Sequence, residues 1–192
     1  MILPVVAYGS PILRKVCDDI TDAYPDLQKL LADMWQTLYN SNGVGLAAPQ
    51  INRPIRLFIV DTIQIVDDFN DEDRKKYPGE VAIKQVFINA RKIEDTGAMW
   101  PYNEGCLSIP KVREDIQRPS HVRLSYMDEN FVQQEGVFHG ITARVIQHEY
   151  DHIDGKLFID YISPLKKRLI KKKLDDITRG KVKTDYRMFF PK

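Results

Sequence analysis

One segment limits the possible folds more than any other part of the chain, because it predicts a helix that is apolar on two opposite sides. It covers residues 139–155 and contains the sequence HGITARVIQHEYDHIDG. The glycines near its ends predict a helix that starts after Gly140 and ends at Asp154-Gly155. At 100° per residue, one narrow face carries Ile141, Val145, His148 and His152, and the opposite face carries Ala143, Ile146, Tyr150 and Ile153. Such a helix is normally buried between layers, so we expect it at the centre of the fold.

The rest of the chain predicts a mixture of helices and strands. An apolar stripe with helical spacing lies within residues 24–43, and strand-like runs follow at 55–61, 84–94, 121–128 and 131–138, the last two joined by a hairpin near 128–130. The charged segment 62–83 contains Pro and Gly and predicts an exposed insertion. We therefore predict one α+β domain over residues 1–192, with antiparallel or mixed β-sheets packed around the central helix, and a C-terminal helix.

The two histidines on the predicted central helix can form a metal site. His148 and His152 are four positions apart, so one helical turn brings both imidazoles to one point. Glu149 lies about 80 to 100° around the helix from His148, which places it beside the ion rather than on it. That position suits a carboxylate that takes a proton from metal-bound water. The alternative is a pair of core histidines whose nitrogens bond to neighbouring polar groups.

A catalytic metal needs a third protein ligand and an open position. Cys106 is the best candidate, since it stands in the glycine-containing stretch EGCLS at residues 104–108. Its alternatives are a buried structural thiol or a cysteine nucleophile activated by a histidine. The other potential ligands are weaker because they lie at strand ends, helix ends or turns; they are His121, His139, Asp154 and Asp160. A Cys-His-His set accepts zinc, iron(II), cobalt or nickel.

Three separated segments together resemble the peptide deformylase family. They are GVGLAAPQ at residues 43–50, EGCLS at 104–108 and QHEYDH at 147–152, in this order along the chain. The resemblance runs from YGSPILRKV near the N-terminus to at least GKLFIDYIS at 155–163. It implies a metal-dependent hydrolase that removes the N-formyl group from N-formylmethionine of new polypeptides and releases formate. It also implies iron(II) as the usual metal, replaceable by zinc, nickel or cobalt.

The resemblance implies a role for each matching residue. Cys106, His148 and His152 would be the metal ligands. Glu149 would be the general acid/base, with metal-bound water as the nucleophile. The side chain of Gln50 and the backbone N–H of Leu107 would face the carbonyl oxygen, and Gly45 would form a hydrogen bond near the substrate.

A methionine side chain needs a narrow apolar pocket. Val44, Ile141 and Val145 are candidates for its walls, although core packing explains each of them equally well. The backbone of GVGLAA at residues 43–48 could also pair with an extended peptide, as edge strands do.

Two other functions fit the histidines and Glu149 of the predicted central helix less well. An HExxH zinc peptidase would use a downstream His or Glu ligand, and no histidine, cysteine or glutamate follows His152. A non-catalytic structural metal site would need four protein ligands, and the sequence offers three good ones.

Charge is distributed unevenly along the chain. Residues 156–192 contain 12 Lys/Arg and 4 Asp/Glu, a balance of +8, whereas residues 1–155 contain 16 and 23, a balance of −7. We predict a basic C-terminal helix and tail over residues 163–192, with Ser163 as N-cap and Pro164 in the first turn. An apolar stripe would dock this helix on the body: Leu165, Leu169, Ile170, Leu174 and Ile177. The basic surface is either a solubilising face or, as the resemblance suggests, a contact with the ribosome surface.

Cysteine content and hydropathy indicate the compartment. The chain has only Cys17 and Cys106, so we do not expect a disulfide framework. No apolar run approaches the ~20 residues that span a bilayer. We expect a cytoplasmic protein with reduced thiols that acts on N-formylmethionyl peptides and binds neither membranes nor specific DNA.

Overall fold

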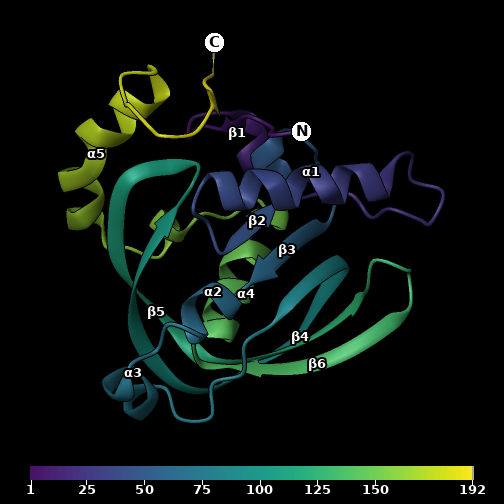
Figure 1. Cartoon of the computed structure of the whole chain (residues 1–192). Coiled ribbons are helices and arrows are strands. Elements are labelled where there is room, and N and C mark those ends of the chain that lie inside the picture. The colour runs from purple at the N-terminus through teal and green to yellow at the C-terminus, as the bar shows by residue number, and fades with distance from the viewer. Residues whose placement is uncertain (192) are drawn as a thin grey trace.

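A computed structural model describes residues 1–191 and shows an α+β fold built on a five-stranded antiparallel sheet (Figure 1). The strand order is β2-β3-β4-β5-β6, and a separate pair, β1-β7, is parallel. The strands are β1 (Val5–Val6), β2 (Gly45–Ala47), β3 (Leu57–Asp61), β4 (Lys84–Cys106), β5 (Ile109–Met127), β6 (Gln133–His139) and β7 (Met188–Phe189). The helices are α1 (Leu27–Asn40), α2 (Ile63–Val66), α3 (Asp71–Lys76), α4 (Gly140–Ile153) and α5 (Pro164–Thr178), with 3-10 turns η1 (Pro11–Arg14), η2 (Ala48–Ile51) and η3 (Phe158–Asp160). The predicted fold class is confirmed.

Helix α4 lies at the centre of the fold, as predicted (Figure 1). It begins at Gly140 and ends at Ile153, with Asp154 as its C-cap. Every residue from Ile141 to Ile153 is buried, because the helix contacts β2, β3, β5 and β6 around it. Both of the predicted apolar faces are therefore covered by protein.

The segment 62–83 is exposed only in part, which corrects the prediction of an exposed insertion. Its helix α3 lies on the surface, but Thr62 and Val66 are buried. The Glu80 carboxylate accepts hydrogen bonds of 2.8 Å from the backbone N–H groups of Ile141 and Thr142. The first N–H groups of a helix have no partner within the helix. The segment therefore caps the N-terminus of α4 and helps to hold this helix in place.

Strands β4 and β5 form one long hairpin, of which the sequence patterns revealed only the outer parts. Strands were predicted at 84–94 and 121–128. In the structure, β4 extends as far as Cys106, and β5, which pairs with it, already begins at Ile109. The middle of the hairpin contains Pro101 and Pro119, shifts its register and exposes many side chains. It therefore lacks the two-residue alternation by which a half-buried strand is recognised. The result is that Cys106 stands at the hairpin tip, close to α4.

Helix α5 begins at the predicted N-cap, since the Ser163 hydroxyl accepts a hydrogen bond from the Lys166 N–H. After α5 the chain returns to the body, where β7 pairs with β1 near the N-terminus. Lys192, the last residue of the predicted basic tail, lies outside the described residues.

Throughout residues 1–191, each helix is too short or too polar to cross a membrane.

The docking stripe of α5 is narrower than predicted. Ile170, Leu174 and Ile177 are buried, but Leu165 and Leu169 are 66% and 74% exposed. Each residue turns the helix by 100°, so Leu165 and Leu169 lie on a different side from the buried three. The prediction that all five residues dock on the body is wrong for these two leucines.

Candidate active site

Three potential metal ligands from distant parts of the chain converge in the structure. Cys106 ends β4, while His148 and His152 lie one turn apart on α4. Their Sγ and imidazole nitrogen atoms all lie within 4.8 Å of one another, and Cys106 Sγ is 3.2 Å from His152 Nε2. We call these three residues the ligand cluster. The residues singled out as ligands in the sequence are thus brought together.

The ligand cluster fits a divalent ion. Two ligands of one tetrahedral ion lie roughly 3.5 Å apart, close to the 3.2 Å between Cys106 and His152. Burial lowers the pKa of His152 well below its ordinary value, which favours the neutral imidazole that a metal ligand requires. The His152 Nδ1 atom is buried without a hydrogen-bond partner among the described residues. Three protein ligands leave one position open, as in catalytic rather than structural sites.

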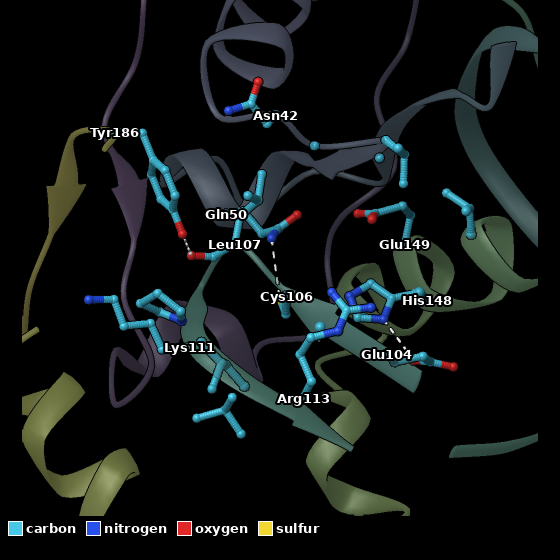
Figure 2. Close-up of a pocket in the computed structure, with 18 of the residues that line it drawn as sticks. Asn42, Gln50, Glu104, Cys106, Leu107, Lys111, Arg113, His148, Glu149 and Tyr186 are labelled. Carbon is cyan, nitrogen blue, oxygen red and sulfur yellow. Dashed lines mark hydrogen bonds and ion pairs between the residues drawn. The ribbon is translucent and has the colours of Figure 1, made fainter. Parts of the chain in front are cut away.

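A buried carboxylate that sequence patterns did not single out orients one of the histidines. Glu104 Oε2 lies 2.9 Å from His148 Nδ1 (Figure 2), which leaves the His148 Nε2 atom for an ion. Glu104 also accepts hydrogen bonds from Arg118 and Arg144, at 2.7 and 2.9 Å. Burial alone would raise the pKa of Glu104, but the hydrogen bonds from His148 and Arg118 hold that pKa well below its usual range. One sequence signal was available: Glu104 and Cys106 are two residues apart, and alternate residues share one face of a strand.

Glu149 stands beside the ligand cluster. Its side chain is buried, and its Oε2 atom has no hydrogen-bond partner within residues 1–191. Burial raises the pKa of Glu149 to about 7, because desolvation disfavours the charged form. Gly45 lies directly against this carboxylate, since a Cβ atom on Gly45 would come within 2.5 Å of Glu149 Oε1. A buried carboxylate with a free oxygen and a pKa near neutrality can accept and return a proton.

The turn that follows β2 directs the Gln50 side chain toward the ligand cluster (Figure 2). The Gln50 Oε1 atom accepts a hydrogen bond of 2.8 Å from the Ala47 N–H. This bond leaves the Gln50 Nε2 atom facing Cys106 Sγ at 3.5 Å and Ser108 Oγ at 3.3 Å. Gln50 is only 1% exposed, so its amide is held in one inward pose.

A cavity of about 580 Å³ lies beside the ligand cluster. Most of the predicted site residues line it: Val44, Gly45, Gln50, Cys106, Leu107, Val145, His148 and Glu149. His152 and Ile141 are not among the described residues that line it, and Ile141 packs in the core around α4. Sequence patterns missed Ile65, Tyr102 and residues 183–186 in the cavity wall, because long-range packing alone brings them there.

The other potential ligands lie elsewhere. Asp154 and Asp160 each form an ion pair with an arginine. His121 and His139 face each other across β5 and β6. In the part of the chain that the structure describes, the ligand cluster is the one group of three or more His, Cys, Asp or Glu side chains placed to share an ion.

Comparison with known sequences gives the family of the chain. The profile of the family described as polypeptide deformylase matches residues 2–168. A protein from Flavobacterium johnsoniae named peptide deformylase is 53% identical, over 99% of this chain and 96% of that protein. Another of the same name, from Christiangramia forsetii, is 50% identical over 100% of this chain and 97% of that protein.

Solved structures agree with the sequence comparison. The crystal structure of a peptide deformylase from Legionella pneumophila has a TM-score of 0.78 at 32% identity and covers 94% of this chain and 98% of that one. The peptide deformylase from Ehrlichia chaffeensis has a TM-score of 0.81 at 26% identity, covering 94% and 99%. These similarities favour neither the zinc peptidase nor the structural metal protein. The chain belongs to the polypeptide deformylase family and is a metal-dependent hydrolase that removes the N-formyl group from new polypeptides.

Proposed function

We propose that the ligand cluster holds the metal ion of this deformylase and that Glu149 is the general acid/base. One observation carries the proposal: three donor atoms converge within 4.8 Å beside a buried carboxylate with a free oxygen. The family resemblance favours iron(II) as the resident ion, with zinc, nickel or cobalt as substitutes. A Cys-His-His set accepts all four ions.

The reaction replaces the formyl C–N bond by a C–O bond from water. When bound, the ion is a Lewis acid that lowers the pKa of a coordinated water to about 7. Glu149 takes a proton from the attacking water as the water oxygen bonds to the formyl carbon. When the C–N bond breaks, Glu149 returns a proton to the departing amine, and formate leaves.

Two donors from this chain stabilise the carbonyl oxygen as it gains negative charge. The first is the Gln50 amide, whose Nε2 atom lies 3.5 Å from Cys106 Sγ. The second is the backbone N–H of Leu107. Leu107 follows Cys106 in the chain and is one of the residues that line the cavity. One such donor is typically worth roughly 3 to 4 kcal/mol of transition-state stabilisation.

The cavity receives the methionine side chain and the peptide that follows it. Val44 and Val145 line the cavity and supply apolar walls. Ile141, one turn before Val145 on α4, supports that wall from within the core. Strand β2 is an edge strand of the five-stranded sheet, so its free edge can pair with an extended peptide.

Formate release from formyl-Met-Ala-Ser by protein purified anaerobically with iron(II) tests the proposed function. We expect turnover of this peptide and no turnover of acetyl-Met-Ala-Ser, because the added methyl group crowds the carbon that water attacks. Hydrolysis of the Met-Ala bond without formate release would identify a peptidase and overturn the proposal.

Gly45→Ala should reduce kcat/KM for formylated peptides by roughly 10- to 100-fold, the cost of a misplaced catalytic group. The new methyl group would occupy the space of the Glu149 carboxylate and push it away from the ligand cluster. Metal content should stay at the wild-type value, since no ligand is touched. Gly136→Ala is the matched control, because Gly136 likewise has no positive φ, its new Cβ would meet the end of the Phe138 ring at 2.8 Å, and Gly136 is not among the described residues that line the cavity. Unchanged kinetics in Gly45→Ala would show that the position of Glu149 is not critical.

We also propose that the protein works in the cytoplasm and that α5 contacts the ribosome surface. Arg168 and Lys172 are exposed on α5, and at 100° per residue they share one side of the helix with the exposed Leu165 and Leu169. A basic face binds RNA phosphates without sequence preference and in a salt-sensitive manner. The substrate of a deformylase emerges from a particle coated with such phosphates.

Reversing two charges on α5 should weaken co-sedimentation with ribosomes. We expect Arg168→Glu combined with Lys172→Glu to lose binding at low salt, while activity on short formyl-peptides stays intact. The matched control is Arg74→Glu combined with Lys75→Glu, which makes the same charge change on the exposed helix α3. Equal co-sedimentation of all three proteins would contradict the α5 contact. Deleting residues 164–192 is a poorer test, because α5 contributes buried residues to the core and residues 183–186 line the cavity.

A further inference from the structure

The C-terminal tail of the chain forms part of the active-site cavity. Residues 183–186 line this cavity although they follow Cys106 by more than 70 positions. Backbone hydrogen bonds fix the tail on the N-terminal segment: Val5 N–H donates to Arg187 O at 2.9 Å, and Ala7 N–H donates to Phe189 O at 2.8 Å. The Thr184 hydroxyl also donates to the Tyr186 carbonyl at 2.7 Å. The tail is therefore an ordered part of the cavity wall.

One tail residue bonds directly to the tip of the β4–β5 hairpin. The Tyr186 hydroxyl donates a hydrogen bond of 2.8 Å to the carbonyl of Leu107 (Figure 2). The next carbonyl, that of Ser108, accepts a hydrogen bond of 2.8 Å from the Tyr8 N–H. Both ends of the chain thus hold the two residues that join β4 to β5. The Ser108 hydroxyl in turn bonds to the Gln50 amide at 3.3 Å, so the same tip touches both donors assigned to the carbonyl oxygen.

We propose that Tyr186 is a positioning residue for deformylation, acting through the peptide backbone of Leu107. The inference rests on the proposed role of the Leu107 N–H as a donor to the carbonyl oxygen. The N–H and the carbonyl of Leu107 flank the same Cα, so fixing the carbonyl restricts the rotation that aims the N–H. An unfixed donor would have to reorient as charge develops, and preorganisation avoids that cost. The phenol suits this task, because burial raises the pKa of Tyr186 above its ordinary value of about 10 and the hydroxyl stays protonated at neutral pH.

The tail also lies opposite the catalytic carboxylate. In Figure 2, Tyr186 and Lys111 stand on one side of the cavity, and Glu149 and His148 stand on the other. A peptide bound between these walls would meet the tail and α4 at the same time. The hydrogen bond of the Tyr186 hydroxyl goes to the Leu107 backbone, and among the described residues it forms none with the ligand cluster or with Glu149.

Tyr186→Phe tests the inference, because it removes the hydroxyl and keeps the ring. We expect kcat for formyl-Met-Ala-Ser to fall about 3- to 10-fold, the range supported by the loss of one neutral hydrogen bond. KM should change by less than about 2-fold, because the bond acts mainly in the transition state. Metal content and melting temperature should stay close to the wild type. Tyr126→Phe is the matched control: its hydroxyl accepts a 2.6 Å bond from Gln85, and it is not among the described residues that line the cavity.

The outcomes separate this inference from the proposed function. If the wild type releases formate and Tyr186→Phe keeps the wild-type kcat, only the inference falls. A lower kcat that simply follows lost metal or lost folded protein, or an equal loss in Tyr126→Phe, would also overturn it, since Tyr186 would then be merely structural. Absence of formate release by the metal-loaded wild type would contradict the proposed function itself.

Discussion

Glu149→Gln should reduce kcat/KM for formylated peptides by at least about 100-fold while the protein keeps its metal. The amide has nearly the shape of the carboxylate but cannot accept a proton from water. Glu149 is not a member of the ligand cluster, and its Oε2 atom has no partner among the described residues. The substitution therefore removes proton transfer without removing a ligand. Steady-state kinetics and metal analysis of the same preparation measure both properties.

Glu149→Ala should behave like Glu149→Gln if proton transfer is the function of this carboxylate. The two variants differ in the volume left at the site, so a shared loss of activity with retained metal excludes a packing effect. A variant that lost its metal but kept its turnover per bound ion would show that Glu149 is structural.

Chelation of the metal should abolish deformylation, and iron(II) or nickel should restore it. Cys106→Ala should lower kcat/KM by at least about 100-fold and should also weaken metal retention, because two imidazoles remain where a catalytic site needs three protein ligands. The metal content that remains after dialysis measures metal retention. The rate of formate release by the same preparation measures activity.

Cys17→Ala provides the matched control for the cysteine substitution. Cys17 is buried in the core, and burial raises the pKa of its thiol to about 11, so it remains a protonated thiol. We expect this variant to keep its metal and its activity per folded molecule. Full activity in the metal-free wild type, or an unaffected Cys106→Ala variant, would refute the assignment of the ligand cluster.

The parts of this site that could be predicted from sequence are local in origin. Helix α4 was predicted from its periodicity and from Gly140 and Gly155 at its ends, because 3.6-residue spacing and glycine termini operate over a few residues. The same spacing places His148 and His152 together on one turn. Cys106 was predicted as the third ligand because a catalytic metal needs three protein ligands and because of the family resemblance. The strand that carries Cys106 was not predicted.

The parts that could not be predicted depend on contacts between distant residues. The inner half of the β4–β5 hairpin has proline and exposed side chains, so its strand character comes from pairing and not from pattern. The two-residue spacing of Glu104 and Cys106 is a sequence signal, but the contact between Glu104 and His148 depends on the packing of that hairpin against α4. Tyr186 reaches Leu107 across 79 positions. Leu165 and Leu169 carried the expected apolar character, but the helix presents them to solvent.

X-ray absorption at the metal edge of the zinc-loaded protein tests the ligand assignment most directly. We expect one sulfur atom at about 2.3 Å and at least two nitrogen atoms at about 2.0 to 2.1 Å from the ion. The sulfur signal should persist in Cys17→Ala and disappear in Cys106→Ala. A spectrum with only nitrogen and oxygen ligands in the wild type, or with sulfur retained in Cys106→Ala, would contradict a metal site formed by Cys106, His148 and His152.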